Sequence, residues 1–97
     1  MKTKEEILRT LEQLKKEIKA SFKVKEIGIF GSVIRKEQKE TSDIDILVDF
    51  EDGADIFDFV GLALFLEERF NQKVDVVPKE DLRKEIKESV LKEVVYL

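Results

Sequence analysis

The stretch Ile29–Phe50 reads IFGSVIRKEQKETSDIDILVDF, and two short pieces of it do not suit a purely structural segment. The pair Gly31-Ser32 ends an apolar run, and Asp43 and Asp45 place two carboxylates in a segment that otherwise alternates like a half-buried strand. Burying a charge costs free energy unless the charge is paired or binds a cation. The two pieces therefore indicate a functional site as well as a fold.

Three segments in and around this stretch are expected to be strands, because they are short and rich in β-branched residues. They are Val24–Phe30, Asp43–Phe50 and Lys73–Val77. In the second strand, Ile44 and Ile46 point to one face, while Asp43 and Asp45 point to the other. A polar loop at residues 40–42 is expected to lead into that strand.

Four helices are expected around these strands, each marked by its apolar spacing. They run from Lys4 to about Ala20, from Ser32 to about Lys39, from Asp55 to about Phe70, and from Lys79 or Asp81 toward the C-terminus. The third helix is apolar almost all round, which favours cover on more than one side; an interface with a partner is the alternative. The order α-β-α-β-α-β-α predicts one α/β (α+β) domain over residues 1–97, with helices that back a small sheet of at least three strands.

The composition excludes several kinds of chemistry. The 97 residues include no cysteine and no histidine, which excludes thiolate and imidazole metal sites and a histidine general base. The net charge of −4 disfavours direct binding to nucleic acid, which needs a basic face. No segment resembles a signal peptide or a membrane span, so a cytoplasmic protein without membrane contact is the expectation. Any metal ion must be a hard cation held by oxygen.

The aspartates predict such a cation. Asp43 and Asp45 are two residues apart on a strand and project from one face, about 6.6 Å apart. Mg²⁺ is commonly bound by one or two carboxylates together with substrate phosphates. Asp75 stands among valines in QKVDVV, and it can join the pair if the third strand lies beside the second. Three such carboxylates suit a site for two metal ions, whereas salt bridges or an exposed sheet edge are the structural alternatives.

The Gly-Ser turn predicts the matching anion site. Gly31 allows an unusual backbone conformation and the close approach of a ligand. Ser32 adds a hydroxyl group, and the amides that open a helix attract anions. Arg35 lies on the same side of that helix and can complete a phosphate site. Alone, the turn is no more than a helix cap, but beside Asp-x-Asp it is what a nucleoside triphosphate with Mg²⁺ requires.

The motif Gly31-Ser32, a gap of ten residues and the sequence Asp43-Ile44-Asp45 resemble the core motif of the DNA polymerase β-like nucleotidyltransferase superfamily. The whole run, the later KVDVV and the short chain resemble the minimal nucleotidyltransferases (MNT) of bacteria and archaea. The resemblance implies a mixed sheet flanked by helices. It also implies that Asp43, Asp45 and Asp75 are the catalytic and Mg²⁺-binding residues, with two ions. The phosphates of ATP would lie over Gly31 and Ser32.

The resemblance further implies a reaction and a partner. The reaction is the transfer of AMP from ATP to an acceptor hydroxyl group, with release of pyrophosphate. The partner is a toxin of the HEPN family, and the MNT protein acts as its antitoxin by modifying a tyrosine. A binding module that neutralises the toxin without catalysis is the alternative. This chain has Ile34-Arg35-Lys36 where the family often has Ala-Arg-Gly, so Arg35 is kept and Lys36 replaces a glycine.

Overall fold

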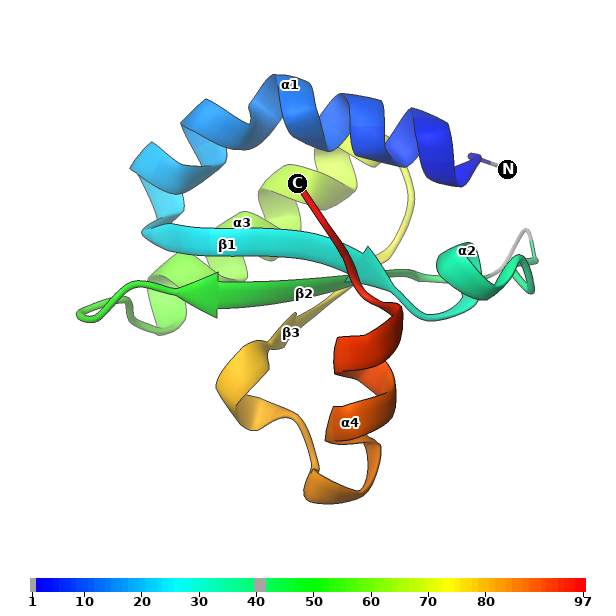
Figure 1. Ribbon diagram of the computed structural model, residues 1–97. Helices are drawn as coiled ribbons and strands as arrows, with labels where there is room; N and C mark the ends of the chain where they lie inside the picture. Colours follow the sequence, from blue (N-terminus) through cyan, green and yellow to red (C-terminus); the bar gives the residue numbers. More distant parts are fainter. Residues whose placement is uncertain (1, 40–41) are drawn as a thin grey trace.

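The computed structural model describes residues 2–39 and 42–97, so most of the loop expected at 40–42 lies outside the described residues. Helices and strands alternate as predicted, with two additions near the C-terminus (Figure 1). The elements are α1 (Lys4–Phe22), β1 (Val24–Phe30), α2 (Ser32–Arg35), β2 (Ile44–Phe50), α3 (Ile56–Phe70), β3 (Val74–Pro78), the 3-10 turn η1 (Lys79–Asp81), α4 (Lys84–Glu93) and β4 (Val95–Tyr96).

The four strands form one mixed sheet in the order β3-β2-β1-β4. β1 is antiparallel to both β2 and β4, whereas β2 and β3 are parallel. The expected mixed sheet is therefore confirmed. The strand β4 was not predicted: it has two residues and pairs Tyr96 with Gly28 and Val95 with Ile29, so it is too short to show an alternating pattern.

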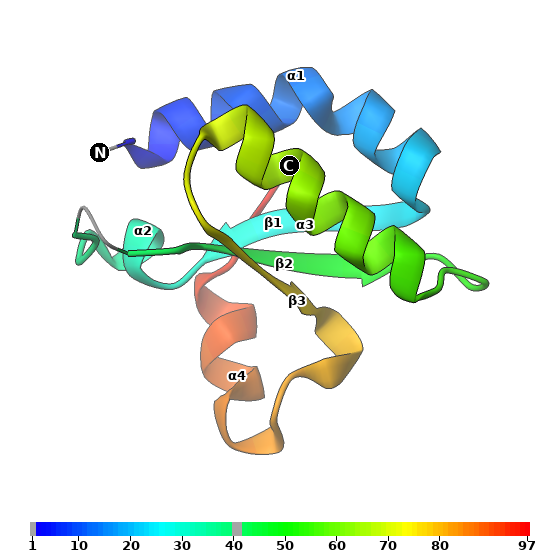
Figure 2. The same ribbon diagram turned by 180° about the vertical axis from the view of Figure 1, so that it is seen from behind.

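The helices lie on both faces of the sheet. α1 and α3 cover one face, and α4 lies against the other (Figures 1 and 2). The predicted inward face of β2 is confirmed, since Ile44, Ile46 and Val48 are fully buried in the core. This core also takes buried side chains from α1 and α3, namely Ile7, Leu11, Ile18, Leu62, Leu66 and Phe70.

The outer face of α3 corrects the prediction that this helix is covered on more than one side. Ile56, Phe57, Val60 and Leu64 expose between 44% and 81% of their surface. The sheet and α1 contact only the inner side of the helix, where Leu62 and its neighbours are buried. An apolar sequence alone does not tell a helix covered on both sides from one whose second side faces solvent.

Two of the smaller helices also differ from expectation. α2 ends at Arg35 rather than near Lys39, because Lys36 takes a left-handed conformation with φ of 59°. The last helix begins at Lys84, since η1 comes first and ends at Asp81. No helix in the described ranges has the length and the apolar character needed to cross a membrane.

Candidate active site

Three segments of the chain meet at one end of the sheet: the turn after β1 and the beginnings of β2 and β3. Phe30, the last residue of β1, lies opposite Asp45 on the antiparallel β2. Asp45 in turn lies opposite Asp75 on the parallel β3. The condition on which the prediction for Asp75 depended, that the third strand lies beside the second, is therefore met.

Gly31 suits this end of the sheet because it has no side chain. Its φ of 78° lies in the left-handed region that favours glycine. A Cβ atom built on Gly31 would lie 2.9 Å from Cγ of Asp45, closer than real Cβ atoms come. Any other residue here would displace either the turn or the Asp45 carboxylate. Glycine is therefore what allows the turn and the aspartate to touch.

The half-buried Asp45 carboxyl group has surroundings that favour its protonated form. Burial is the largest cause that raises its pKa, and the negative charges of Asp75 and Asp43 raise the pKa further. The backbone N–H of Ser32 and the charge of Arg35 act in the opposite direction. A cation beside Asp45 would relieve this unfavourable charge. The donor set therefore fits a hard ion such as Mg²⁺.

The three predicted carboxylates are not gathered into a single cluster. Asp43 is half-buried just before β2, and Asp75 is exposed on the edge strand β3. Within residues 2–39 and 42–97, no group of three or more acidic side chains stands close enough to hold a metal ion. Asp45 and Asp75 are the pair that the register brings side by side, and a site for two metal ions stays a prediction.

The Gly-Ser turn is in contact with the C-terminal helix through Glu93. Oε1 of Glu93 accepts a hydrogen bond from the backbone N–H of Gly31 at 2.9 Å. Nη1 of Arg35 donates to both carboxylate oxygens of Glu93, at 3.0 and 3.2 Å. Nε of Arg35 also donates to Glu37 at 2.7 Å. The hydrogen bonds from Arg35 to Glu37 and Glu93 raise the pKa of the guanidinium group further above its usual range.

Glu93 was not predicted as a site residue from the sequence. The residue lies in a helix with many charged residues and is separated from Gly31 by 62 positions, so no local pattern distinguishes it. Only the tertiary fold, which places α4 against the sheet, brings it to the turn (Figure 1).

A cleft of about 370 Å³ separates this end of the sheet from α4. Gly31, Arg35, Asp45 and Asp75 line it from the sheet side, and Glu93 lines it from the helix. The remaining lining residues are mostly apolar: Phe30, Val77, Leu82, Ile86, Ser89 and Val90. The cleft therefore combines acidic groups, an arginine and a glycine turn above an apolar wall.

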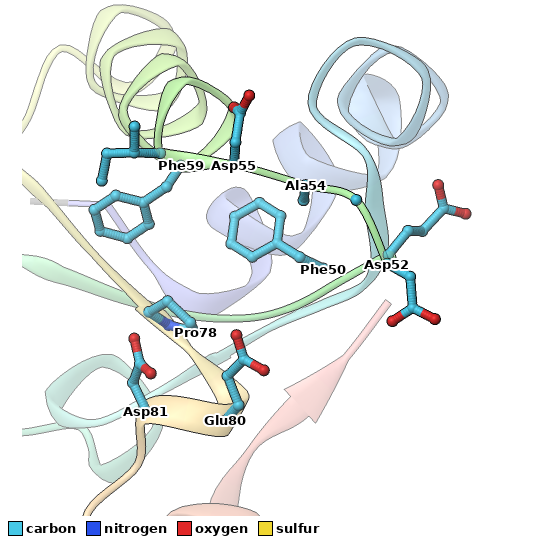
Figure 3. Close-up of a pocket in the computed structure, with 11 residues that line it drawn as sticks. Phe50, Asp52, Ala54, Asp55, Phe59, Pro78, Glu80 and Asp81 are labelled. Atoms are coloured by element: carbon cyan, nitrogen blue, oxygen red, sulfur yellow. The ribbon is translucent and has the colours of Figure 1, made fainter.

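A larger cavity, of about 500 Å³, lies at the opposite end of β2 and β3. Figure 3 shows Phe50, Phe59 and Pro78 around it, with the carboxylates of Glu80 and Asp81 below. None of the predicted site residues lines this cavity. The smaller cleft is the candidate active site, because of the two cavities only this one is lined by carboxylates, a glycine turn with a backbone donor and a guanidinium group.

The sequence matches the family model described as "Nucleotidyltransferase domain" over residues 11–97. It is 47% identical over 97 residues to the protein adenylyltransferase MntA of Thermococcus cleftensis, covering all of this chain and 98% of that protein. At this identity, a match along the full length of both proteins shows a common family.

Solved structures agree with the sequence match. A structure provisionally described as a minimal nucleotidyltransferase superposes with a TM-score of 0.76 at 35% identity, covering 93% of this chain and 95% of that chain. A crystal structure of a toxin-antitoxin with AMP-PNP gives a TM-score of 0.70 at 25% identity, covering 88% of this chain and 70% of that chain. The chain thus belongs to the nucleotidyltransferase domain family, and it is a minimal nucleotidyltransferase.

Proposed function

We propose that the protein is an Mg²⁺-dependent adenylyltransferase that transfers AMP from ATP to a tyrosine of a HEPN-family toxin, and so acts as the antitoxin. The observation that carries the proposal is the meeting of the Gly31 turn with Asp45 and Asp75 in one cleft. It is supported by the relative named a protein adenylyltransferase and by the toxin-antitoxin structure with AMP-PNP. We further infer that the reaction takes place in the cytoplasm, where ATP is available, and that residues 1–97 act as one domain.

The anion side of the site would hold the triphosphate. The backbone N–H groups of Gly31 and Ser32 and the Ser32 hydroxyl group would donate to the β- and γ-phosphate oxygens. Arg35 lines the same cleft and would add a positive charge to these phosphates. Held in this way, the triphosphate would present its α-phosphorus to the acceptor, and the pyrophosphate would be the leaving group.

The acidic side of the site would hold the metal ions and act on the acceptor tyrosine. Asp43 and Asp45 would hold Mg²⁺ at the triphosphate, and Asp75 would join them at a second ion. When bound, Mg²⁺ neutralises the charge that develops on the transferring phosphoryl group. Asp75 would also take the proton of the acceptor tyrosine. The tyrosine oxygen would then bond to the α-phosphorus, and the bond from the α-phosphorus to the oxygen that bridges it to the β-phosphorus would break. Positioning and charge stabilisation would supply most of the rate, as in phosphoryl transfer generally.

Label transfer tests this function directly. The purified protein is incubated with its HEPN partner, Mg²⁺ and ATP labelled at the α-phosphate. We expect label on the partner with the wild type and none with the double variant Asp43→Asn/Asp45→Asn. Wild-type protein that transfers no label to the partner overturns the proposal.

A second function, neutralisation of the partner by binding alone, is favoured by one observation. The apolar outer face of α3 is exposed, and a surface of this kind is typical of a protein interface. The same double variant separates the two functions. If it still neutralises the partner toxin in full, binding is sufficient. If silencing is lost while the complex still forms, catalysis is required.

A further inference from the structure

Glu93 accepts hydrogen bonds from two groups at the Gly31 turn, the Gly31 N–H and the Arg35 guanidinium group. Its carboxylate accepts the Gly31 N–H at 2.9 Å and is bridged to Nη1 of Arg35 at 3.0 and 3.2 Å. The side chain of Glu93 is only 21% exposed, so this contact is partly shielded from water. The carboxylate also lines the cleft that holds Asp45 and Asp75.

The Gly31 N–H and Arg35 are two of the donors that the proposed function assigns to the phosphates of ATP. A carboxylate oxygen and a phosphate oxygen are both anionic acceptors and use the same N–H groups. The Gly31 N–H carries a single hydrogen, so one strong acceptor occupies it. The guanidinium group of Arg35 is already shared between Glu93 and Glu37. A phosphate that reaches the turn therefore meets a carboxylate in its place.

Repulsion acts in the same direction. A phosphate in the cleft would lie beside the negative charge of Glu93 in addition to those of Asp45 and Asp75. A metal ion held by the aspartates offsets their charge. Glu93 comes from α4, on the opposite wall of the cleft. Its charge is balanced by Arg35, which is the group that the phosphate would recruit.

We propose that Glu93 is a positioning residue of the nucleotide site, which occupies two of the phosphate donors, the Gly31 N–H and Arg35, and is displaced when ATP binds. It holds Gly31 and Arg35 in place and thereby lowers the affinity for ATP. The inference rests on the proposed function, because it requires that phosphates bind at this turn. The displaced carboxylate frees α4 from the turn, and this helix otherwise buries a single residue, Val90.

The first experiment measures the affinity for a nucleotide that cannot react. Calorimetric titration with Mg²⁺ and α,β-methylene-ATP compares the wild type with Glu93→Gln. Glutamine keeps the size of the side chain and removes its charge, so we expect the dissociation constant to fall about threefold or more. The control is Glu88→Gln on the same helix, where the carboxylate is exposed and paired with Lys92, and no change is expected there.

Each outcome of this titration decides a question. Tighter binding by Glu93→Gln alone supports the inference, as does binding by Glu93→Gln when the wild type shows none. Equal or weaker binding by Glu93→Gln overturns the inference, because Glu93 would then only stabilise the Gly31 turn and would not compete with the nucleotide. Absence of binding by every variant overturns the proposed function, and the inference fails with it.

A double-mutant cycle tests whether Glu93 acts through Arg35. If the carboxylate competes with phosphate for this guanidinium group, the gain from Glu93→Gln shrinks in the Arg35→Gln background. An unchanged gain overturns the route through Arg35. In the transfer assay, Glu93→Gln is expected to lower the KM for ATP by a larger factor than it changes kcat. If Glu93 only stabilised the turn and did not compete with ATP, Glu93→Gln would instead lower kcat and leave KM the same or higher.

Discussion

The two ends of the sheet carry two acidic hollows that differ in how their groups are held. At the β1 turn, Asp45 and Asp75 stand opposite each other on paired strands, next to a glycine turn that supplies backbone donors. At the other end the hollow is larger, but its acids, such as Asp52 and Glu80, come from a loop and a 3-10 turn. The comparison teaches that carboxylates converging from neighbouring strands beside a backbone donor, rather than the volume of a cavity, identify the candidate active site.

The largest expected effect is on catalysis. Asp45→Asn should lower the rate of AMP transfer by about a hundredfold or more, since it removes a charge from the centre of the site. Asp81→Asn, in the opposite hollow, should leave the rate unchanged. Initial rates of label transfer at saturating ATP measure both. Equal losses at the two ends would show that the chemistry is not confined to the smaller cleft.

The second effect compares two glycines with positive φ, one at each end of the sheet. Gly31→Ala forces a Cβ toward the Asp45 carboxylate and should cost about 2–4 kcal/mol of stability. Gly53→Ala, in the other hollow, has φ of 91° but nothing within 4 Å of the new Cβ, and it should cost only about 1 kcal/mol. Urea unfolding followed by circular dichroism gives both values. Equal costs would mean that the contact between the turn and Asp45 is not tight.

The third effect concerns the backbone beside the same turn. Lys36 has φ of 59°, a conformation that glycine adopts without strain. Lys36→Gly should therefore stabilise the protein by about 0.5 kcal/mol, after the higher entropy of glycine in the unfolded chain is subtracted. The midpoint of urea unfolding checks this, and a lower midpoint would show that the lysine side chain contributes more than the strain costs.

The smallest effect is on stability and comes from Asp45 itself. Its pKa is raised in the folded state, chiefly by burial, so its negative charge weakens the fold above that pKa and the penalty is relieved as the pH falls through it. Without metal, Asp45→Asn should stabilise the protein at neutral pH by a few tenths of a kcal/mol, because the half-exposed group is screened by solvent. The gain should shrink as the pH falls. Thermal unfolding in chelator measures it, and a gain that grows toward acid would contradict the assigned direction.

Much of the fold could be predicted because its signals are local. The strand β1 has the predicted bounds, and the alternation in β2 correctly separated Ile44 and Ile46 from the two aspartates. Asp75 could be recognised because an acidic residue among valines conflicts with its surroundings, although its place beside Asp45 depended on a strand pairing that periodicity does not reveal.

What could not be predicted depends on contacts between distant residues. Glu93 reaches Gly31 only because α4 folds back against the sheet, and β4 is a strand only because the edge of β1 is free to pair with it. The end of α2 depends on the left-handed conformation of Lys36, and a lysine in the sequence does not predict that conformation. The exposed side of α3 depends on which layers are present around the helix.

The pairing of β4 with β1 has a practical consequence for protein production. The last residues lie in the sheet next to Gly28 and Ile29, and the N–H of Leu97 donates to the carbonyl of Ile27 at 3.1 Å. Glu93 lies two residues before this strand, so a purification tag fused after Leu97 would strain the segment that brings Glu93 to the Gly31 turn. A tag before residue 2 leads into α1, on the opposite face of the sheet from α4 (Figure 1). Enzymes made for kinetic work should therefore carry the tag at the N-terminus, with a cleavable site.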